Sequence, residues 1–368
     1  MKTAKRSNRS WWYIAWIFSA WGLGLSCGQK IPLPPTPDIP STTLEQFLPF
    51  AWGSDALQVD LNAPEDIFTG LDRLLYVADT GNDRIIMLDK AGRVQGISQP
   101  VPNPVAIGQD NLLNLLIVNE TNVVYKIDLV AHRHLIAEAP VETLAVGVDN
   151  AVFTGVAAFG DQGNFYVTDK QNSRIWRWDG DALKPVIFQG TGVGTANAPT
   201  GITSFLIPSG NIANSLDNEG FIFTQMGEVF KIQWIGGGNV FPPFAPQISP
   251  SDNVDFFNHF KNDGLDGDID YLPEDVAVDN SGRIYVIDSK ADSVFIFNRN
   301  GEFLMDRNQI HILSFGGTGS GEKQFRNPKG IAFLDADDDQ VLYVADTGNN
   351  RILRFKLSSE FDSGFPKR

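Results

Sequence analysis

Two pairs of adjacent carboxylates are the residues best suited to chemistry in this sequence. Glu65-Asp66 and Glu274-Asp275 each follow a proline at the start of a short apolar segment. If the fold brings the pairs together, their oxygens could hold a divalent cation, because Ca²⁺ prefers carboxylate and other oxygen ligands. The alternative is that all four are solvated acids of ordinary turns. We treat them as candidate ligand-binding residues with both interpretations open.

A second group of oxygen ligands lies in residues 262–270, NDGLDGDID. Asp266, Asp268 and Asp270 form a candidate metal site because glycines between them permit sharp turns, loosely as in a calcium loop. The downstream spacing of an EF-hand is missing, so an acidic flexible loop is the alternative. No cofactor is firmly indicated; Ca²⁺ or another divalent cation is the one that these residues suit.

The usual signals of catalysis are missing from the sequence. It contains neither a Gly-x-Ser-x-Gly elbow nor a P-loop, and its single cysteine, Cys27, lies near the start of the chain. His132 and His134 share a strand face by spacing, but no third zinc ligand is close in sequence. We therefore predict no catalytic residue, and the sequence favours a binding protein over an enzyme.

The charge balance restricts the class of partner. Removing the four basic groups of residues 1–26 (Lys2, Lys5, Arg6 and Arg9) from the formal charge of −15 leaves −19 on the remainder. A nucleic-acid site needs clustered Lys and Arg, and no such cluster follows residue 26. The expected partners are a protein, a peptide or a small neutral or cationic ligand, and no nucleic acid.

A repeated hairpin must position these residues. The stretch LYVADTGNDRIIML at 75–88 returns as LYVADTGNNRILRF at 342–355, and an apolar run, a turn and a second run predict two paired strands. Six copies occur at spacings that favour the blades of a propeller. Their first strands are aligned on Asp79, Asn119, Asp169, Met226, Asp288 and Asp346.

Most copies begin with a short strand led by a proline, so the full unit is Pro-x-Gly/Asp-Val-Ala, Tyr-Val-x-Asp and Arg-Ile-x-x-Phe. This unit resembles the NHL repeat over residues 57–357, although Asn119 and Met226 replace the aspartate in two copies. The resemblance implies an all-β fold, a six-bladed β-propeller of four-stranded blades. We interpret the recurring Asp, Asn and Arg as parts of the scaffold, because a functional site should be asymmetric.

The last copy has no clear outer strand of its own after Leu357. Since an unpaired blade edge invites aggregation, another segment must cover it. Residues 56–61 have a strand-like pattern, and we expect them to close the ring as an N-terminal strand. The folded domain, residues 44–368, is expected to be a monomer.

Residues 1–26 read as a signal peptide: a basic start is followed by an apolar run of about 15 residues, too short to span a bilayer. The stretch resembles a bacterial lipoprotein signal, which implies lipidation of Cys27 and attachment to a membrane. Ordinary cleavage or an uncleaved anchor is the alternative. Residues 27–43 contain five prolines and read as a tether. The expected location is the cell envelope, at the outer membrane or cell surface.

An insertion at residues 235–272 interrupts the repeat and concentrates aromatic side chains. Loops of this length are usually functional, so Phe256 and Phe257 are candidate ligand-binding residues. The competing interpretation is a plug that packs over the channel or the blade edges. Burial of the two side chains would distinguish these uses.

The function most consistent with these features is an exported, lipid-anchored propeller that acts as a ligand-binding or protein-interaction module at the bacterial cell envelope. The alternative is a divalent-metal-dependent hydrolase or lyase, since propellers of the gluconolactonase type hold a cation over the channel. Glu65, Asp66, Glu274 and Asp275 are the only candidates for such a role here.

Overall fold

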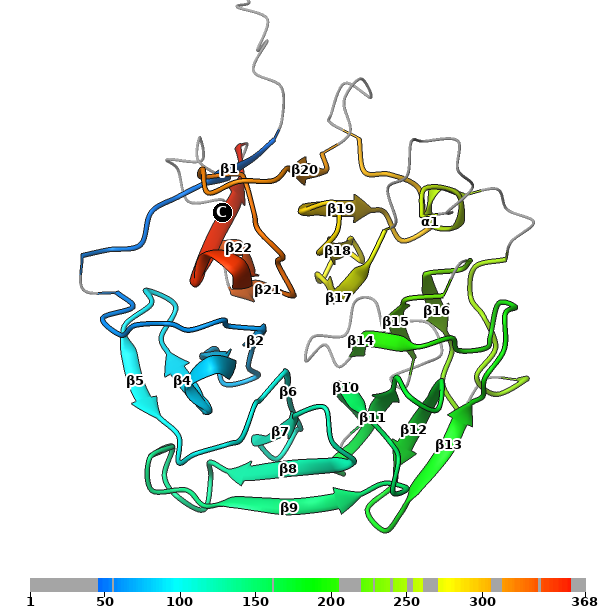
Figure 1. Ribbon diagram of the computed structural model, residues 1–368, viewed down its shortest axis with the longest axis horizontal. Coiled ribbons are helices and arrows are strands. Elements are labelled where there is room, and N and C mark those ends of the chain that lie inside the picture. The colour runs from blue at the N-terminus through cyan, green and yellow to red at the C-terminus, as the bar shows by residue number, and fades with distance from the viewer. Residues whose placement is uncertain are drawn as a thin grey trace, which may run out of the picture. The chain divides into compact units, whose positions relative to one another are not determined.

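The protein is an all-β, six-bladed propeller (Figure 1). The computed structural model describes residues 46–54, 56–160, 162–204, 220–227, 229–238, 241–249, 254–260, 271–305, 313–336 and 339–358. Residues 45–368 form one compact unit. Within the described ranges, no helix is long and apolar enough to cross a membrane.

Each blade is an antiparallel sheet numbered here in chain order. Blade one contains β2 (Asp66–Thr69), β3 (Leu75–Asp79), β4 (Arg84–Leu88) and β5 (Val94–Ile97). Blade two contains β6 (Ala106–Gln109), β7 (Asn114–Val118), β8 (Val123–Asp128) and β9 (Val141–Val146). Blade three contains β10 (Phe153–Phe159), β11 (Asn164–Asp169), β12 (Arg174–Trp178) and β13 (Leu183–Ile187). Blade four contains β14 (Pro199–Ser204), β15 (Phe221–Gln225) and β16 (Ile232–Ile235). Blade five contains β17 (Pro273–Val278), β18 (Ile284–Asp288), β19 (Ser293–Phe297) and β20 (Phe315–Gly316). Blade six contains β21 (Gly330–Ala336), β22 (Asp339–Asp346), β23 (Arg351–Leu357) and β1 (Phe47–Pro49). The described helices are η1 (Thr80–Asn82), η3 (Thr347–Asn349) and α1 (Asp255–Asn258).

The core is divided among the boundaries between blades. The inner strands contact one another in the order β2, β6, β10, β14, β17, β21 and back to β2, which closes a ring around a central channel. Six hydrophobic clusters each join two adjacent blades. Because both faces of a blade are covered, every residue of β3 is buried. Double burial explains why the second strands read as continuous apolar runs rather than alternating ones.

The recurring aspartates hold the hairpin turns, as the scaffold interpretation predicts. The carboxylate of Asp79 is fully buried, and its Oδ2 accepts hydrogen bonds from Arg84 Nε at 2.7 Å and Asn82 Nδ2 at 2.8 Å. Asp346 has the same two partners in Arg351 and Asn349. A buried carboxylate is costly unless its lone pairs are satisfied, so these partners explain the recurrence of Asn and Arg.

The register corrects the sequence alignment of the fourth copy. Pro199 pairs with Gln225, as Pro273 pairs with Asp288 in blade five, so Gln225 and not Met226 stands at the aspartate position. Its Oε1 accepts a hydrogen bond from Asn197 N at 2.8 Å, equivalent to the bond from Asn62 N to Asp79 in blade one. An amide oxygen therefore substitutes for the carboxylate.

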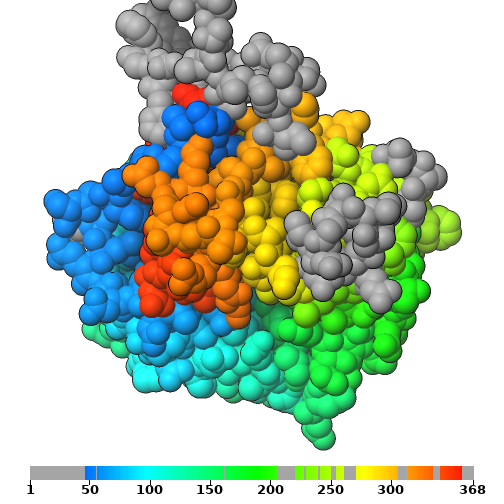
Figure 2. Space-filling model, turned by 45° about the horizontal axis from the view of Figure 1, so that its top comes forward, coloured from blue at the N-terminus to red at the C-terminus, as the bar shows by residue number. Residues whose placement is uncertain are grey.

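An N-terminal strand closes the ring, which confirms that prediction, but residues 56–61 are not that strand. β1 pairs antiparallel with β23, placing Phe47 opposite Leu357 (Figure 1). Figure 2 shows the N-terminal residues in blue against blade six in orange and red. The apolar residues of 56–61 instead pack on the cluster between blades six and one, which accounts for their strand-like alternation: Leu57, Val59 and Leu61.

Candidate functional site

The residues at the start of the inner strands differ in charge from blade to blade. Each inner strand is led by a proline, or by Phe153 in blade three. The residue that follows it is, in blade order, Glu65, Val105, Thr154, Thr200, Glu274 or Lys329. At the next position stand Asp66, Ala106, Gly155, Gly201, Asp275 and Gly330. All ionisable members therefore belong to blades five, six and one, which are neighbours in the ring. This asymmetry distinguishes the channel mouth from the repeated scaffold.

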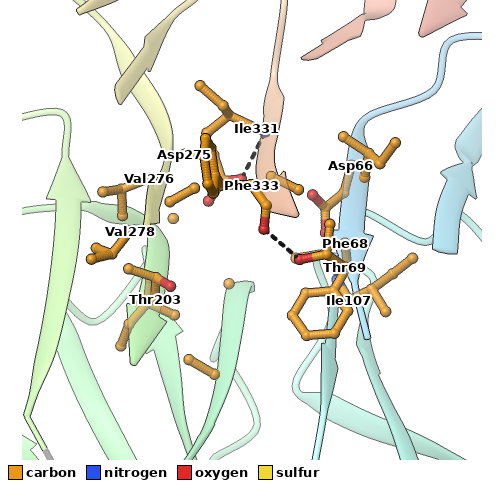
Figure 3. A pocket seen from close by; sticks show the side chains of 18 of the residues that line it. Asp66, Phe68, Thr69, Ile107, Thr203, Asp275, Val276, Val278, Ile331 and Phe333 are labelled. Carbon is orange, nitrogen blue, oxygen red and sulfur yellow. Dashed lines mark hydrogen bonds between the residues drawn. The ribbon is translucent and has the colours of Figure 1, made fainter. Parts of the chain in front are cut away.

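The aspartates of blades one and five each accept a hydrogen bond from a backbone amide of the next blade. Asp66 Oδ2 accepts a hydrogen bond from Ile107 N at 2.7 Å, and Asp275 Oδ2 accepts one from Ile331 N at 3.1 Å. Figure 3 shows the two aspartates on opposite sides of the strand that carries Ile331 and Phe333. The structure thus places Asp66 and Asp275 at the channel with a single blade between them.

Glycine in the preceding blade permits this arrangement. A Cβ on Gly330 would lie 2.6 Å from Asp66 Cα, and a Cβ on Gly201 would lie 2.6 Å from Asp275 Cα. Such distances are too short for carbon atoms, so any larger residue would push the blades apart. Each Glu-Asp copy is preceded around the ring by a copy with glycine at the same position. The glycine of one copy and the aspartate of the next form a pattern that is visible in the sequence and could have predicted this close approach.

Burial changes the protonation of these carboxyls. Loss of hydration raises the pKa of Asp66 to about 7, opposed by its backbone hydrogen bonds. Burial and the nearby charge of Asp66 raise the pKa of Asp275 well above its usual value. Burial also raises the pKa of Glu65, against the stabilising charge of Lys329. The site therefore contains one carboxyl, that of Asp66, which titrates near neutral pH, beside two others whose pKa values are raised.

A cavity of about 430 Å³ occupies the channel beside these groups. Its lining contains residues of all six inner strands, from Glu274, Asp275 and Lys329 at one end to Arg73 and Asn280 at the other. Apolar side chains such as Ile107, Val276 and Phe333 form much of the wall seen in Figure 3. A small molecule that has both apolar and polar groups fits this combination.

The two glutamates are already engaged by protein groups. Glu65 Oε1 lies 2.8 Å from Lys329 Nζ, and Glu274 Oε1 accepts a hydrogen bond from Ser289 Oγ at 2.7 Å. Among the residues with described positions, no group of three or more His, Cys, Asp or Glu could hold a metal ion. Ca²⁺ takes six to eight oxygen ligands, so this set does not fit a calcium centre. Asp266, Asp268, Asp270 and Cys27 lie outside the described residues.

Phe256 and Phe257 are packed in the core. Both belong to α1, and their side chains are buried in the cluster between blades four and five. The ring of Phe256 meets that of Phe297 edge-on at 5.5 Å, and Phe257 meets Phe230 at 5.3 Å. The structure therefore supports the alternative interpretation for these two residues, which pack in the core.

The comparisons with known proteins agree with the fold. No protein-family model matches the chain, and no curated protein sequence matches it. Among solved structures, a streptogramin B lyase is 12% identical with a TM-score of 0.53, covering 86% of this chain and 98% of its own. A gluconolactonase from Xanthomonas campestris is 15% identical with a TM-score of 0.53, covering 81% and 87%. At these identities the similarity establishes the propeller architecture alone.

A third similar structure has the same level of likeness. The calcium-binding protein regucalcin from Agrobacterium tumefaciens is 12% identical with a TM-score of 0.52, covering 82% of this chain and 91% of its own. The three neighbours are a lyase, a lactonase and a calcium-binding protein. One fold therefore carries different activities in them, and function has to be argued from the residues of the site.

Proposed function

We propose that this protein is a ligand-binding propeller that takes a small molecule with a cationic group at the charged half of its channel mouth. The observation that carries the proposal is the location of Asp66 and Asp275 beside a 430 Å³ cavity whose lining combines polar groups with apolar side chains. The opposite half of the mouth, on blades two to four, carries no ionisable group at the equivalent positions. A ligand would thus be oriented with its positive group toward blades five, six and one.

The binding test uses amides that keep the hydrogen-bond acceptor but remove the charge. Asp66→Asn should weaken binding of agmatine or cadaverine by at least about tenfold in calorimetric titrations at about pH 8, above the Asp66 pKa of about 7, since a charged hydrogen bond contributes roughly 1.5–3 kcal/mol. Asp275→Asn should weaken binding less, because burial raises the pKa of Asp275 as well. Asp149→Asn, an exposed carboxylate outside the channel, is the matched control. Equal affinity in all four proteins, or no binding of either amine, would refute the proposal.

A lyase or hydrolase is the second candidate function. It is favoured by the pKa of Asp66 near 7, because a general acid or base works best when its pKa is near the working pH. Two structural neighbours, the gluconolactonase and the streptogramin B lyase, are enzymes by name. Turnover of a panel of lactones that disappears in Asp66→Asn would favour this function. Amine binding without turnover of any member would favour the binding module.

We further infer that the propeller is exported and anchored to the bacterial cell envelope through a lipid on Cys27, and that its blades are of the NHL type. The basic, apolar and small-residue order ahead of Cys27 supports the anchor. Cys27→Ser should release the protein from membranes or block its processing, because acyl chains contribute about 0.8 kcal/mol of membrane affinity per buried methylene. A processed Ser variant that stays on membranes would contradict the anchor.

A further inference from the structure

One arginine of the repeated turn motif is not used by the scaffold. In blades one and six, Arg84 and Arg351 bind the buried aspartate and backbone carbonyl oxygens of neighbouring loops. Arg174 occupies the same position in blade three, opposite Asp169 at the end of the hairpin. Across the residues with described positions, its side chain forms no hydrogen bond or ion pair.

A tryptophan has replaced the arginine as the partner of the aspartate. Asp169 Oδ2 accepts hydrogen bonds from Trp176 Nε1 at 3.1 Å and from Asn172 Nδ2 at 2.9 Å. Its Oδ1 accepts from the backbone amides of Val152 and Asn172. The carboxylate is therefore satisfied without the guanidinium of Arg174.

Aromatic rings hold the released guanidinium in place. Its central carbon lies 5.7 Å from the Trp176 ring centroid and 5.9 Å from the Phe188 ring centroid. The Nε atom is buried without a hydrogen-bond partner in the described part of the chain. Since this nitrogen is closed to solvent, a ligand would meet the four N–H donors of the two terminal nitrogens, whose planar arrangement matches an anion with two oxygens.

An exposed apolar ring lies against Arg174. Phe188 is 55% exposed, and Val148, in the neighbouring blade two, is 45% exposed. Phe188 follows the end of β13, while Val148 lies in the connection between β9 and β10, at the same end of the sheets. A hydrogen bond of 3.0 Å from Asn150 to Asn172 joins this connection to the turn that precedes Arg174.

We propose that Arg174 is the centre of a surface site for a small organic carboxylate with an apolar body. The carboxylate would accept two hydrogen bonds from the guanidinium, and the apolar body would cover Phe188. The site belongs to blade three at the periphery of the ring and is independent of the channel. The net negative charge of the protein opposes anions at long range, so the selectivity has to come from this local fork and its rings.

The experiment compares phenylacetate with its neutral analogue phenylacetamide in calorimetric titrations of the full chain up to about 20 mM. We expect the wild-type protein to bind the acid more tightly than the amide. Arg174→Gln should weaken binding of the acid by at least about tenfold and remove the preference, and Arg174→Lys should restore only part of it because an ammonium lacks the fork. Arg299→Gln, at an exposed arginine in blade five, should bind like the wild type.

A second comparison tests whether the substitutions disturb folding. Arg174→Gln should melt close to the wild-type temperature because the arginine donates to no aspartate, whereas Arg84→Gln should melt at a lower temperature because it leaves Asp79 buried without its charged partner. If the wild type binds neither compound, binds both equally, or binds the acid as well in Arg174→Gln, the proposal is wrong.

Discussion

Glu65 of the first blade and Lys329 of the last blade form an ion pair of 2.8 Å across the boundary where the ring closes. Both side chains are partly exposed, at 19% and 29%, and both lie at the mouth of the channel. The pair therefore sets the charge of the candidate site more than it stabilises the fold, since partly exposed pairs contribute about 0–1 kcal/mol.

Removing Lys329 should strengthen binding of a cationic ligand. Lys329→Met leaves Glu65, Asp66, Glu274 and Asp275 without an opposing charge at the equivalent inner-strand positions, so affinity for agmatine should rise several-fold at about pH 8.5 and low ionic strength. The melting temperature should barely change. Lys90→Met, at an exposed lysine of blade one, is the control. Unchanged or weaker binding by Lys329→Met would contradict a cation site at this mouth.

Stability should depend on pH through Asp66. Its folded-state pKa of about 7 lies above the ordinary value near 3.9, so the folded protein keeps a proton that the unfolded chain has lost between about pH 4 and pH 7. Stability from this group is fully present below about pH 4 and is lost as the pH rises through 7. Asp66→Asn lacks this titration, so its free energy of unfolding should exceed that of the wild type by up to about 4 kcal/mol at pH 8.

Urea unfolding at several pH values measures this difference. The advantage of Asp66→Asn should shrink steadily as the pH falls from 8 to 5. Parallel curves for the two proteins over that range would mean that Asp66 is ionised in the folded state at pH 5. Binding of a cationic ligand should show the opposite trend and strengthen with rising pH, because the ionised carboxylate is the form that attracts it.

Phe47 should be essential for closing the ring. Its side chain is 3% exposed, stacks on Phe315 at 5.7 Å and meets Tyr285 edge-on at 6.0 Å. Phe47→Ala should lower the free energy of unfolding by about 3–5 kcal/mol, the usual range for a buried aromatic. Chemical denaturation measures the loss, and Gln46→Ala, at the exposed neighbouring position, is the control. An unchanged midpoint would mean that β23 is protected without β1.

Phe256 and Phe257 should matter for stability. Replacing either with Ser removes a buried ring and places a hydroxyl in the cluster between blades four and five, so the melting temperature should fall markedly. Phe241→Ser, at a 99% exposed ring in the same insertion, should leave the melting temperature unchanged. Unchanged melting of Phe256→Ser would contradict the packing role and return the residue to the candidates for recognition.

Local features of the fold could be predicted from the sequence. The hairpins at Asp79 and Asp346 follow from turn chemistry within a few residues, and the prolines mark the inner strands. The charged positions Asp66 and Asp275 could be selected because they break the repeat. Their closeness could not be predicted from either copy alone, since it depends on the order of blades and on the space left by Gly330.

Features set by long-range packing were harder to predict. β1 has only three residues, and its place is fixed by Phe47 against Tyr285, whereas the longer apolar pattern of residues 56–61 serves a neighbouring cluster. The aromatic residues of the insertion carry no periodicity that separates a buried plug from an exposed surface. Arg174 occupies the same position in the repeat as Arg84. Only Trp176, two residues later, indicates that the aspartate of this blade has a different partner.

The pairing of β1 with β23 gives synthesis of this protein a built-in test of completeness. β1 is the first of the described strands to be made and its partner the last, and the indole of Trp52 donates a hydrogen bond to the carbonyl oxygen of Ile352 across a separation of 300 residues. A chain that stops before Arg351 can form earlier blades, but it leaves the first strand without a partner and blade six open. Products that lack β23 would therefore present unpaired strand edges, while chains that contain β23 close the ring.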